Sequence, residues 1–199
     1  MENYRPISLL NNLSKVFERL MYNRVTNFLD KRKVLNNNQF GFRPGHSTID
    51  ALYTCANMIT TAKGNNKHIL GIFLDLSKAF DTVNHNILLC KLSHYGVRGC
   101  ALKWFKSHLS ERCEFTALGD VHSLKSKISI GVPQGSILGP LLFLIYVNDI
   151  FNCCSNVGLK LFADDTNIFV SDNSLSDLFC TALCKINNWF KCNLLSVNS

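Results

Sequence analysis

The chain has 199 residues, of which 47% are hydrophobic and 18% are charged, a composition that suits one globular domain or at most two. Lysine and arginine number 21 against 14 aspartate and glutamate residues, which gives a formal net charge of +7. This excess disfavours a disordered or strongly acidic protein and favours a polyanionic partner, although many basic proteins bind no nucleic acid.

The sequence also argues against secretion and membrane insertion. The first 20 residues mix charged and amide side chains with apolar ones, and the longest apolar run, residues 137–147, contains Gly139 and Pro140. The 9 cysteines include no C-x-x-C pair, so neither a disulfide framework nor a zinc site is indicated. We expect the cysteines to be small buried side chains in a reducing compartment. The protein itself is expected to be intracellular, in the nucleus and cytoplasm.

Hydrophobic periodicity predicts two helices in the first part of the chain. An apolar face over residues 13–30 predicts a helix whose apolar face lies in the core, with Glu18 pointing away from it. Ser47 and Asp50 form a capping box that opens a second helix, which ends near residue 61. Leu52 and Ile59 are among its residues expected to point inward.

A loop between these helices carries Arg43, and its glycines and proline suggest a defined shape. A guanidinium on such a loop suits a triphosphate, but an ordinary surface arginine has the same appearance in the sequence.

Residues 68–76 form a nearly continuous apolar run that predicts a strand buried on both faces, with Asp75 at its end. A carboxylate in that position is unfavourable unless it meets a cation. Phe80 follows closely, and its ring could lie beside the sugar of a bound nucleotide or simply pack in the core. Helices are predicted next, over residues 87–95 and 102–109.

Alternation around Gly119 predicts a β-hairpin over residues 112–130. The following loop contains Gln134 and Gly135, which could touch a template base or a nucleotide, or could form only a turn. Pro140 is well placed as the first residue of an apolar helix that ends near residue 150.

Two adjacent carboxylates, Asp164 and Asp165, interrupt the apolar run at residues 159–170, which predicts two strands joined by a tight turn at the acids. Two carboxylates about 4 Å apart repel by roughly 4 kcal/mol at an effective dielectric of about 20. A bound divalent cation usually holds such a pair ionised, although a solvated turn explains the segment equally well. Asp75 adds a third carboxylate, and this hard-oxygen set suits a two-metal Mg²⁺ site for phosphoryl transfer. A capping box at residues 174–177 then opens a final helix.

Five ordered blocks of the sequence resemble the reverse transcriptase domain of non-LTR (LINE-type) retrotransposons. They are residues 3–9, 39–48, 73–81, 131–140 and the FADD tetrapeptide at residues 162–165. The order of predicted elements indicates an α+β fold. The resemblance implies a right-hand polymerase with an antiparallel palm sheet backed by helices, in which about residues 1–66 are mainly fingers and about residues 67–199 mainly palm.

The same resemblance implies an RNA-directed DNA polymerase, a nucleotidyltransferase with an RNA template, a DNA primer and dNTPs as partners. Two Mg²⁺ ions are the implied cofactors, and Mn²⁺ is an expected substitute. The implied catalytic residues are Asp75, Asp164 and Asp165, and the implied metal ligands are these three with the Leu76 carbonyl. The implied nucleotide-binding residues are Arg43, Phe80, Gln134 and Gly135, with Phe80 as the gate against a ribose 2′-hydroxyl.

The chain departs from the family pattern at its ends and at Phe162. An endonuclease region, a primer grip and a thumb are expected to be absent, and the family's lysine after Asn198 is not reached, so a truncated fragment is expected. Phe162 stands where many relatives have tyrosine and keeps the ring.

Three other functions remain open from the sequence. An RNA-dependent RNA polymerase would favour a smaller residue or a 2′-hydroxyl acceptor in place of Phe80 at the gate. A decayed, non-catalytic nucleic-acid binder would keep the fold and the basic charge. A structural module that binds no nucleic acid would not be retained on a polyanion column at low salt.

Overall fold

The computed structural model describes residues 7–110, 112–155, 157–172 and 175–198. These residues form six α-helices and three small antiparallel sheets, so the predicted α+β class is confirmed. Within this described part of the chain, no helix is both long enough and apolar enough to cross a membrane. The capping box predicted at residues 174–177 lies outside the described residues, although helix α6 (Leu175–Cys192) forms where expected.

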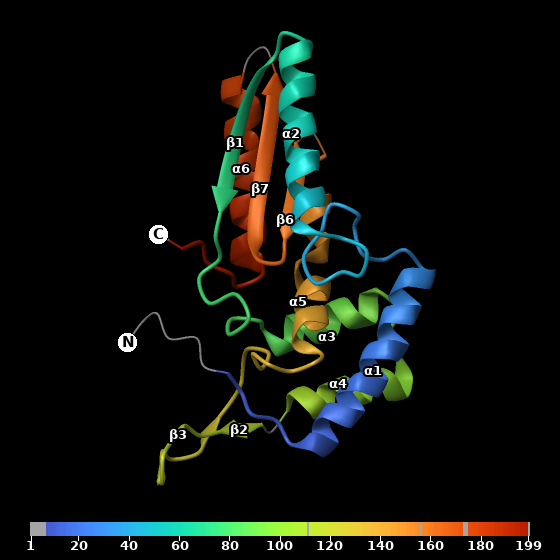
Figure 1. The fold of residues 1–199 in the computed structure, drawn as a ribbon, viewed down its shortest axis with the longest axis vertical. Coiled ribbons are helices and arrows are strands. Elements are labelled where there is room, and N and C mark those ends of the chain that lie inside the picture. Colours follow the sequence, from blue (N-terminus) through green and yellow to red (C-terminus); the bar gives the residue numbers. More distant parts are fainter. Residues whose placement is uncertain (1–6, 111, 156, 173–174, 199) are drawn as a thin grey trace.

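The main sheet has three strands in the order β1-β7-β6, which are β1 (His68–Leu74), β6 (Gly158–Phe162) and β7 (Asp165–Asp172). Strands β6 and β7 form the predicted hairpin, in which Phe162 pairs with Asp165 and the turn consists of Ala163 and Asp164. Figure 1 shows the end of β1 and this turn at the same end of the sheet. The chain therefore brings two distant acidic segments to one edge.

Helices cover both faces of this sheet. Helix α6 packs behind β7, and helix α2 (Thr48–Gly64) lies across β6 and β1 (Figure 1). The predicted capping box of α2 is present, because the side chains of Ser47 and Asp50 each bond the other residue's backbone N–H. The hairpin turn therefore lies at the end of a sheet that has a helix on each face.

One continuous core runs from α3 (His85–His94), α4 (Gly99–Leu109) and α5 (Gly139–Val147) to strands β6 and β7 and helix α6. Helix α5 is apolar on all sides, and all of its residues except Pro140 are buried. A 3₁₀ helix, η1 (Asn148–Asn152), continues it. Lys91 of α3 pairs with Asp149 at 2.7 Å, and Trp189 of α6 donates to the same carboxylate at 3.2 Å. Burial lowers the pKa of Lys91, whereas Asp149 acts in the opposite direction.

The hairpin predicted around Gly119 is confirmed as two short, exposed ladders. Strand β2 (Cys113–Glu114) pairs with β5 (Ser126–Lys127), and β3 (Ala117–Leu118) pairs with β4 (Val121–His122).

Helix α1 (Asn12–Lys31) forms where predicted, but part of its predicted core face is wrong. Four apolar residues of its first half are exposed: Leu13, Val16, Phe17 and Leu20. Glu18, predicted to point outward, is instead 0% exposed. The reason is that backbone N–H groups of a distant loop need the Glu18 carboxylate as an acceptor, which local periodicity does not reveal.

Three further predictions of burial are wrong. Strand β1 lies at an edge of the sheet, so Phe73 is 71% exposed. Leu52 and Ile59 of α2 also face solvent, because α2 covers a sheet of only three strands. Most of the cysteines are exposed, while Cys154 is buried. In each case the sequence shows an apolar side chain but not the limited number of elements available to cover it.

Candidate functional site

The three predicted catalytic carboxylates lie at one end of the main sheet. Asp75 directly follows β1, Asp164 occupies the turn, and Asp165 is the first residue of β7. Leu74 pairs with Thr166 as the last pair of the β1–β7 ladder, so Asp75 and Asp165 are the residues next to this pair on the two strands. Asp75 and Asp165 are exposed, and Asp164 is half-buried.

The donor chemistry of this sheet end fits a hard divalent cation, because Mg²⁺ prefers carboxylate and carbonyl oxygens. Over the described residues, however, no three Asp, Glu, His or Cys side chains form a ready-made metal cluster. One carboxylate oxygen of Asp75, Oδ2, accepts a hydrogen bond from Asn198 Nδ2 at 3.2 Å. The backbone therefore gathers the three acids at one end, while their side chains do not converge on one point.

The C-terminal segment runs beside Asp75. Leu76, whose carbonyl is a predicted metal ligand, is 5% exposed and forms an antiparallel bridge with Val197. The backbone N–H of Asn198 donates to the Asp75 carbonyl at 2.8 Å. Asn198 thus bonds Asp75 through both its backbone and its side chain, a contact that the sequence alone did not indicate.

Arg43 lies in the loop between α1 and α2, and its guanidinium is held by that loop's own backbone. Nη1 donates to the carbonyl oxygens of Asn36 at 2.6 Å and Gln39 at 3.3 Å. Burial lowers the pKa of Arg43, and the Asp30 carboxylate acts in the opposite direction. The observed bonds give Arg43 a part in shaping the loop, and its contact with a nucleotide stays a prediction.

Phe80 lies between two other aromatic rings. Phe143 of α5 stacks on it with centroids 4.8 Å apart and an interplanar angle of 23°. Phe42 meets it edge-on at 6.0 Å. Phe42 is 53% exposed and has a φ of 53°, a left-handed conformation that residues with a Cβ rarely adopt. The ring of Phe80 is therefore fixed on one side by the core and bordered on another by an exposed aromatic residue.

The loop containing Gln134 and Gly135 docks on the segment after Phe80. Gln134 Nε2 donates to Asp81 Oδ1 at 3.1 Å. Gly131, which begins the loop, has a φ of 88°, and a Cβ there would lie 2.8 Å from the Asp81 carbonyl oxygen. Gly135 is exposed, with a φ of 99°. The structure thus bonds Gln134 to Asp81, the residue after Phe80 in the chain, whose role the sequence did not indicate.

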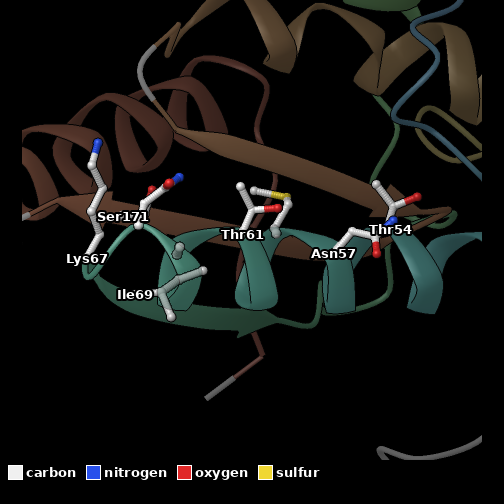
Figure 2. A pocket seen from close by; sticks show the side chains of 9 residues that line it. Thr54, Asn57, Thr61, Lys67, Ile69 and Ser171 are labelled. Atoms are coloured by element: carbon white, nitrogen blue, oxygen red, sulfur yellow. The ribbon is translucent and has the colours of Figure 1, made fainter.

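A surface hollow of about 350 Å³ lies away from these residues. Figure 2 shows Thr54, Asn57 and Thr61 of α2 lining it together with Ile69 and Ser171. Ile69 pairs with Ser171 at the end of the β1–β7 ladder remote from Asp75. The hollow includes none of the predicted site residues, so it is not the candidate site.

Comparison with known sequences identifies relatives over nearly the whole chain. The probable RNA-directed DNA polymerase from transposon BS of Drosophila melanogaster is 34% identical, over 99% of this chain and 23% of that protein. The RNA-directed DNA polymerase from mobile element jockey of Drosophila melanogaster is 35% identical, over 88% of this chain and 20% of that protein. The chain thus spans less than a quarter of the length of these relatives.

Solved structures share the fold at low sequence identity. Telomerase from Candida albicans in complex with the TWJ fragment of telomeric RNA aligns with a TM-score of 0.66 and 13% identity, over 94% of this chain and 34% of that chain. Apo telomerase from Candida tropicalis aligns with a TM-score of 0.65 and 15% identity, over 91% of this chain and 35% of that chain. The family model described as "Reverse transcriptase (RNA-dependent DNA polymerase)" matches residues 1–199. The chain therefore belongs to the reverse transcriptase family and is similar to the enzymes of non-LTR retrotransposons.

Proposed function

We propose that this chain is the catalytic core of an RNA-directed DNA polymerase, which extends a DNA primer on an RNA template inside the cell, in the nucleus and cytoplasm. The observation that supports the proposal is the β1–β7 register, whose last pair, Leu74 with Thr166, leaves Asp75 and Asp165 as the next residues at the sheet end where the turn residue Asp164 lies. In this proposal residues 1–66 act mainly as fingers and residues 67–199 mainly as palm. The longer relatives contain further sequence that would complete the grip on the primer–template duplex.

The acidic end of the sheet is the proposed metal site. Asp75, Asp164 and Asp165, with the Leu76 carbonyl, would hold two Mg²⁺ ions, or Mn²⁺ in their place. The chemistry that such ions supply when bound is activation of the primer 3′-hydroxyl and stabilisation of the pyrophosphate leaving group. The primer 3′-hydroxyl would lose its proton to water as its oxygen forms a bond to the α-phosphorus of the dNTP, and the bond from that phosphorus to the pyrophosphate oxygen would break.

The remaining predicted residues would bind and orient the nucleotide. Arg43 offers a planar guanidinium to the triphosphate. Phe80, held by its stack on Phe143, would occupy the space that a ribose 2′-hydroxyl needs. Gln134, held by Asp81, and the exposed backbone of Gly135 would contact the nucleotide or the template base.

A single-nucleotide addition assay on an RNA template with a DNA primer tests the proposal, because one addition requires little grip on the duplex. We expect Mg²⁺-dependent incorporation of dNTPs and little incorporation of rNTPs. Equal use of rNTPs would favour an RNA polymerase. Binding of primer–template without synthesis in Mg²⁺ or Mn²⁺ would favour a non-catalytic nucleic-acid binder.

A further inference from the structure

We infer that Gln39 is a positioning residue for the turn that carries Asp164, an inference that rests on the proposed function. Gln39 lies in the loop between α1 and α2 and is 2% exposed. Its Oε1 accepts a hydrogen bond from the Ala163 N–H at 2.9 Å, and its Nε2 donates to the Ala163 carbonyl at 3.3 Å. One side-chain amide therefore bonds both backbone polar groups of the residue immediately before Asp164.

The conformation of Ala163 explains why the turn needs this support. Ala163 has a φ of 56°, in the left-handed region that a residue with a Cβ adopts at an energetic cost. It is also 5% exposed, so its backbone groups need partners inside the protein. Gln39 supplies both partners in the geometry of this turn. The dihedral angles of Ala163 in turn set the direction in which the Asp164 side chain leaves the hairpin.

The backbone around Gln39 is fitted to the same hairpin. The Phe40 N–H donates to the Leu161 carbonyl, and the Leu161 N–H donates to the Asn38 carbonyl, each at 2.9 Å. These bonds add the loop to the free edge of β6 as a short parallel segment, and Figure 1 shows it beside the lower end of that strand. A Cβ at Gly41 would lie 2.3 Å from the Ala163 nitrogen, so the loop and the turn touch without spare room.

This arrangement links Arg43, which is proposed to bind the nucleotide, to the proposed metal site. Arg43 Nη1 donates to the Gln39 carbonyl at 3.3 Å, so the residue that holds the acidic turn also accepts a bond from the guanidinium. A misplacement of a catalytic group by about 1 Å can reduce the rate of a reaction on the order of 10²-fold. Gln39 therefore couples the position of Asp164 to the loop that presents Arg43.

Two variants of the chain test this role. Gln39→Met keeps the length and much of the packing of the side chain but removes the amide. Gly41→Ala keeps Gln39 and forces the loop away from Ala163 by steric conflict. The matched control is Asn148→Leu, because Asn148 is also a buried amide whose side chain bonds the Val34 carbonyl and the Asn36 N–H, each at 2.9 Å, instead of the turn at Ala163.

The measurements are Mn²⁺ affinity by electron paramagnetic resonance without nucleotide, hydrogen exchange of the Ala163 amide, and kcat and KM for dNTP in single-nucleotide addition. We expect both test variants to lose Ala163 protection, to bind Mn²⁺ about 10- to 100-fold more weakly, and to lose kcat by a similar factor. The KM for dNTP should change much less in Gln39→Met, which keeps the backbone carbonyl that accepts from Arg43. Asn148→Leu should lower the melting temperature while leaving Mn²⁺ affinity and Ala163 exchange near the parental values.

The possible failures can be told apart. Parental Mn²⁺ affinity in folded Gln39→Met or Gly41→Ala would overturn the positioning role, whatever the polymerase activity. If Gln39→Met does not fold, Gly41→Ala alone decides. A parental chain that binds Mn²⁺ but adds no nucleotide would refute the proposed function, and the variants' Mn²⁺ affinities would still decide the role of Gln39. A parental chain that binds no Mn²⁺ would overturn both.

Discussion

The buried carboxylate of Glu18 in α1 accepts a hydrogen bond from the backbone N–H of Ile137 at 2.8 Å, and the Leu138 N–H points to the same oxygen at 3.4 Å. These donors lie where the chain enters α5, whose N-cap residue makes no side-chain capping bond. Glu18, which belongs to α1, therefore serves α5 as an N-cap side chain would, and its carboxylate suits the positive end of the α5 dipole. The contact joins α1 to the loop that carries Gln134.

Removing this acceptor should destabilise the protein measurably. Glu18→Leu leaves the buried N–H groups of Ile137 and Leu138 without their acceptor, so the free energy of unfolding should fall by about 1–3 kcal/mol. Glu18→Gln keeps an acceptor oxygen and should have a smaller effect. Urea unfolding of both variants checks the ranking, with the exposed Glu114→Gln as control. A Glu18→Gln variant less stable than Glu18→Leu would contradict the capping role.

Glu18 also shows what the sequence could not predict. Hydrophobic periodicity correctly located α1, yet it could not reveal that the partners of Glu18 lie 119 and 120 residues away in sequence. The same limit applies to Gln39, whose partner Ala163 is 124 residues away. Polar side chains that hold distant backbone have no local pattern, so both residues appeared to be ordinary surface or loop positions.

The acidic residues, in contrast, were predictable because their pattern is local in the sequence. Asp75 and the Asp164–Asp165 pair interrupt apolar strands, and a carboxylate in that setting is conspicuous within a few residues of sequence. The hairpin and its turn were therefore expected, and the structure shows them. The register that brings Asp75 to the same sheet end as Asp165 required the pairing of β1 with β7, which single strands do not specify.

The stability of the protein should depend on pH through His108 of α4. Its Nε2 lies 3.7 Å from Glu18 Oε1, and its ring stacks on Trp104 at 4.8 Å. Burial, and secondarily the Arg112 guanidinium, lower the pKa of His108 to about 4. In the unfolded chain a histidine titrates near pH ~6.5, so between there and about pH 4 the unfolded state binds more protons. The free energy of unfolding should therefore fall as the pH falls through this window.

The nearby Glu18 carboxylate favours protonated His108, so it should moderate this loss of stability without reversing it. Urea unfolding at several pH values checks the prediction. His108→Phe, which keeps a ring against Trp104, should flatten the dependence, whereas the exposed His122→Gln should retain it. Equal slopes in the parental chain and His108→Phe would show that other groups cause the pH dependence.

Phe80→Val should increase the use of rNTPs, because loss of the ring opens the space proposed to exclude a 2′-hydroxyl. The ratio of kcat/KM for dNTP to kcat/KM for rNTP measures this effect. The substitution also removes the stack on Phe143, so the melting temperature should fall. Phe143→Leu is the control, since it weakens the same stack while leaving the gate residue in place. An unchanged ratio in Phe80→Val would mean that the ring serves packing alone.

Asp164→Asn should abolish nucleotide addition while leaving the fold intact. The substitution preserves the shape of the side chain, and the backbone carbonyl that accepts from Thr166 Oγ1 at 3.3 Å is unaffected. Stability should stay the same or rise, because one of three neighbouring carboxylates loses its charge and repulsion decreases. Activity should fall to background, because the proposed Mg²⁺ site loses an anionic ligand.

The measurements are single-nucleotide addition, Mn²⁺ affinity and the melting temperature of the same preparation. Asp120→Asn, in the exposed hairpin turn between β3 and β4, is the control for removal of one negative charge. It should match the parental chain in all three measurements. Asp164→Asn that extends primers near the parental rate would remove this carboxylate from the proposed site. Loss of activity with unchanged Mn²⁺ affinity would instead assign Asp164 a role in catalysis other than holding the ions.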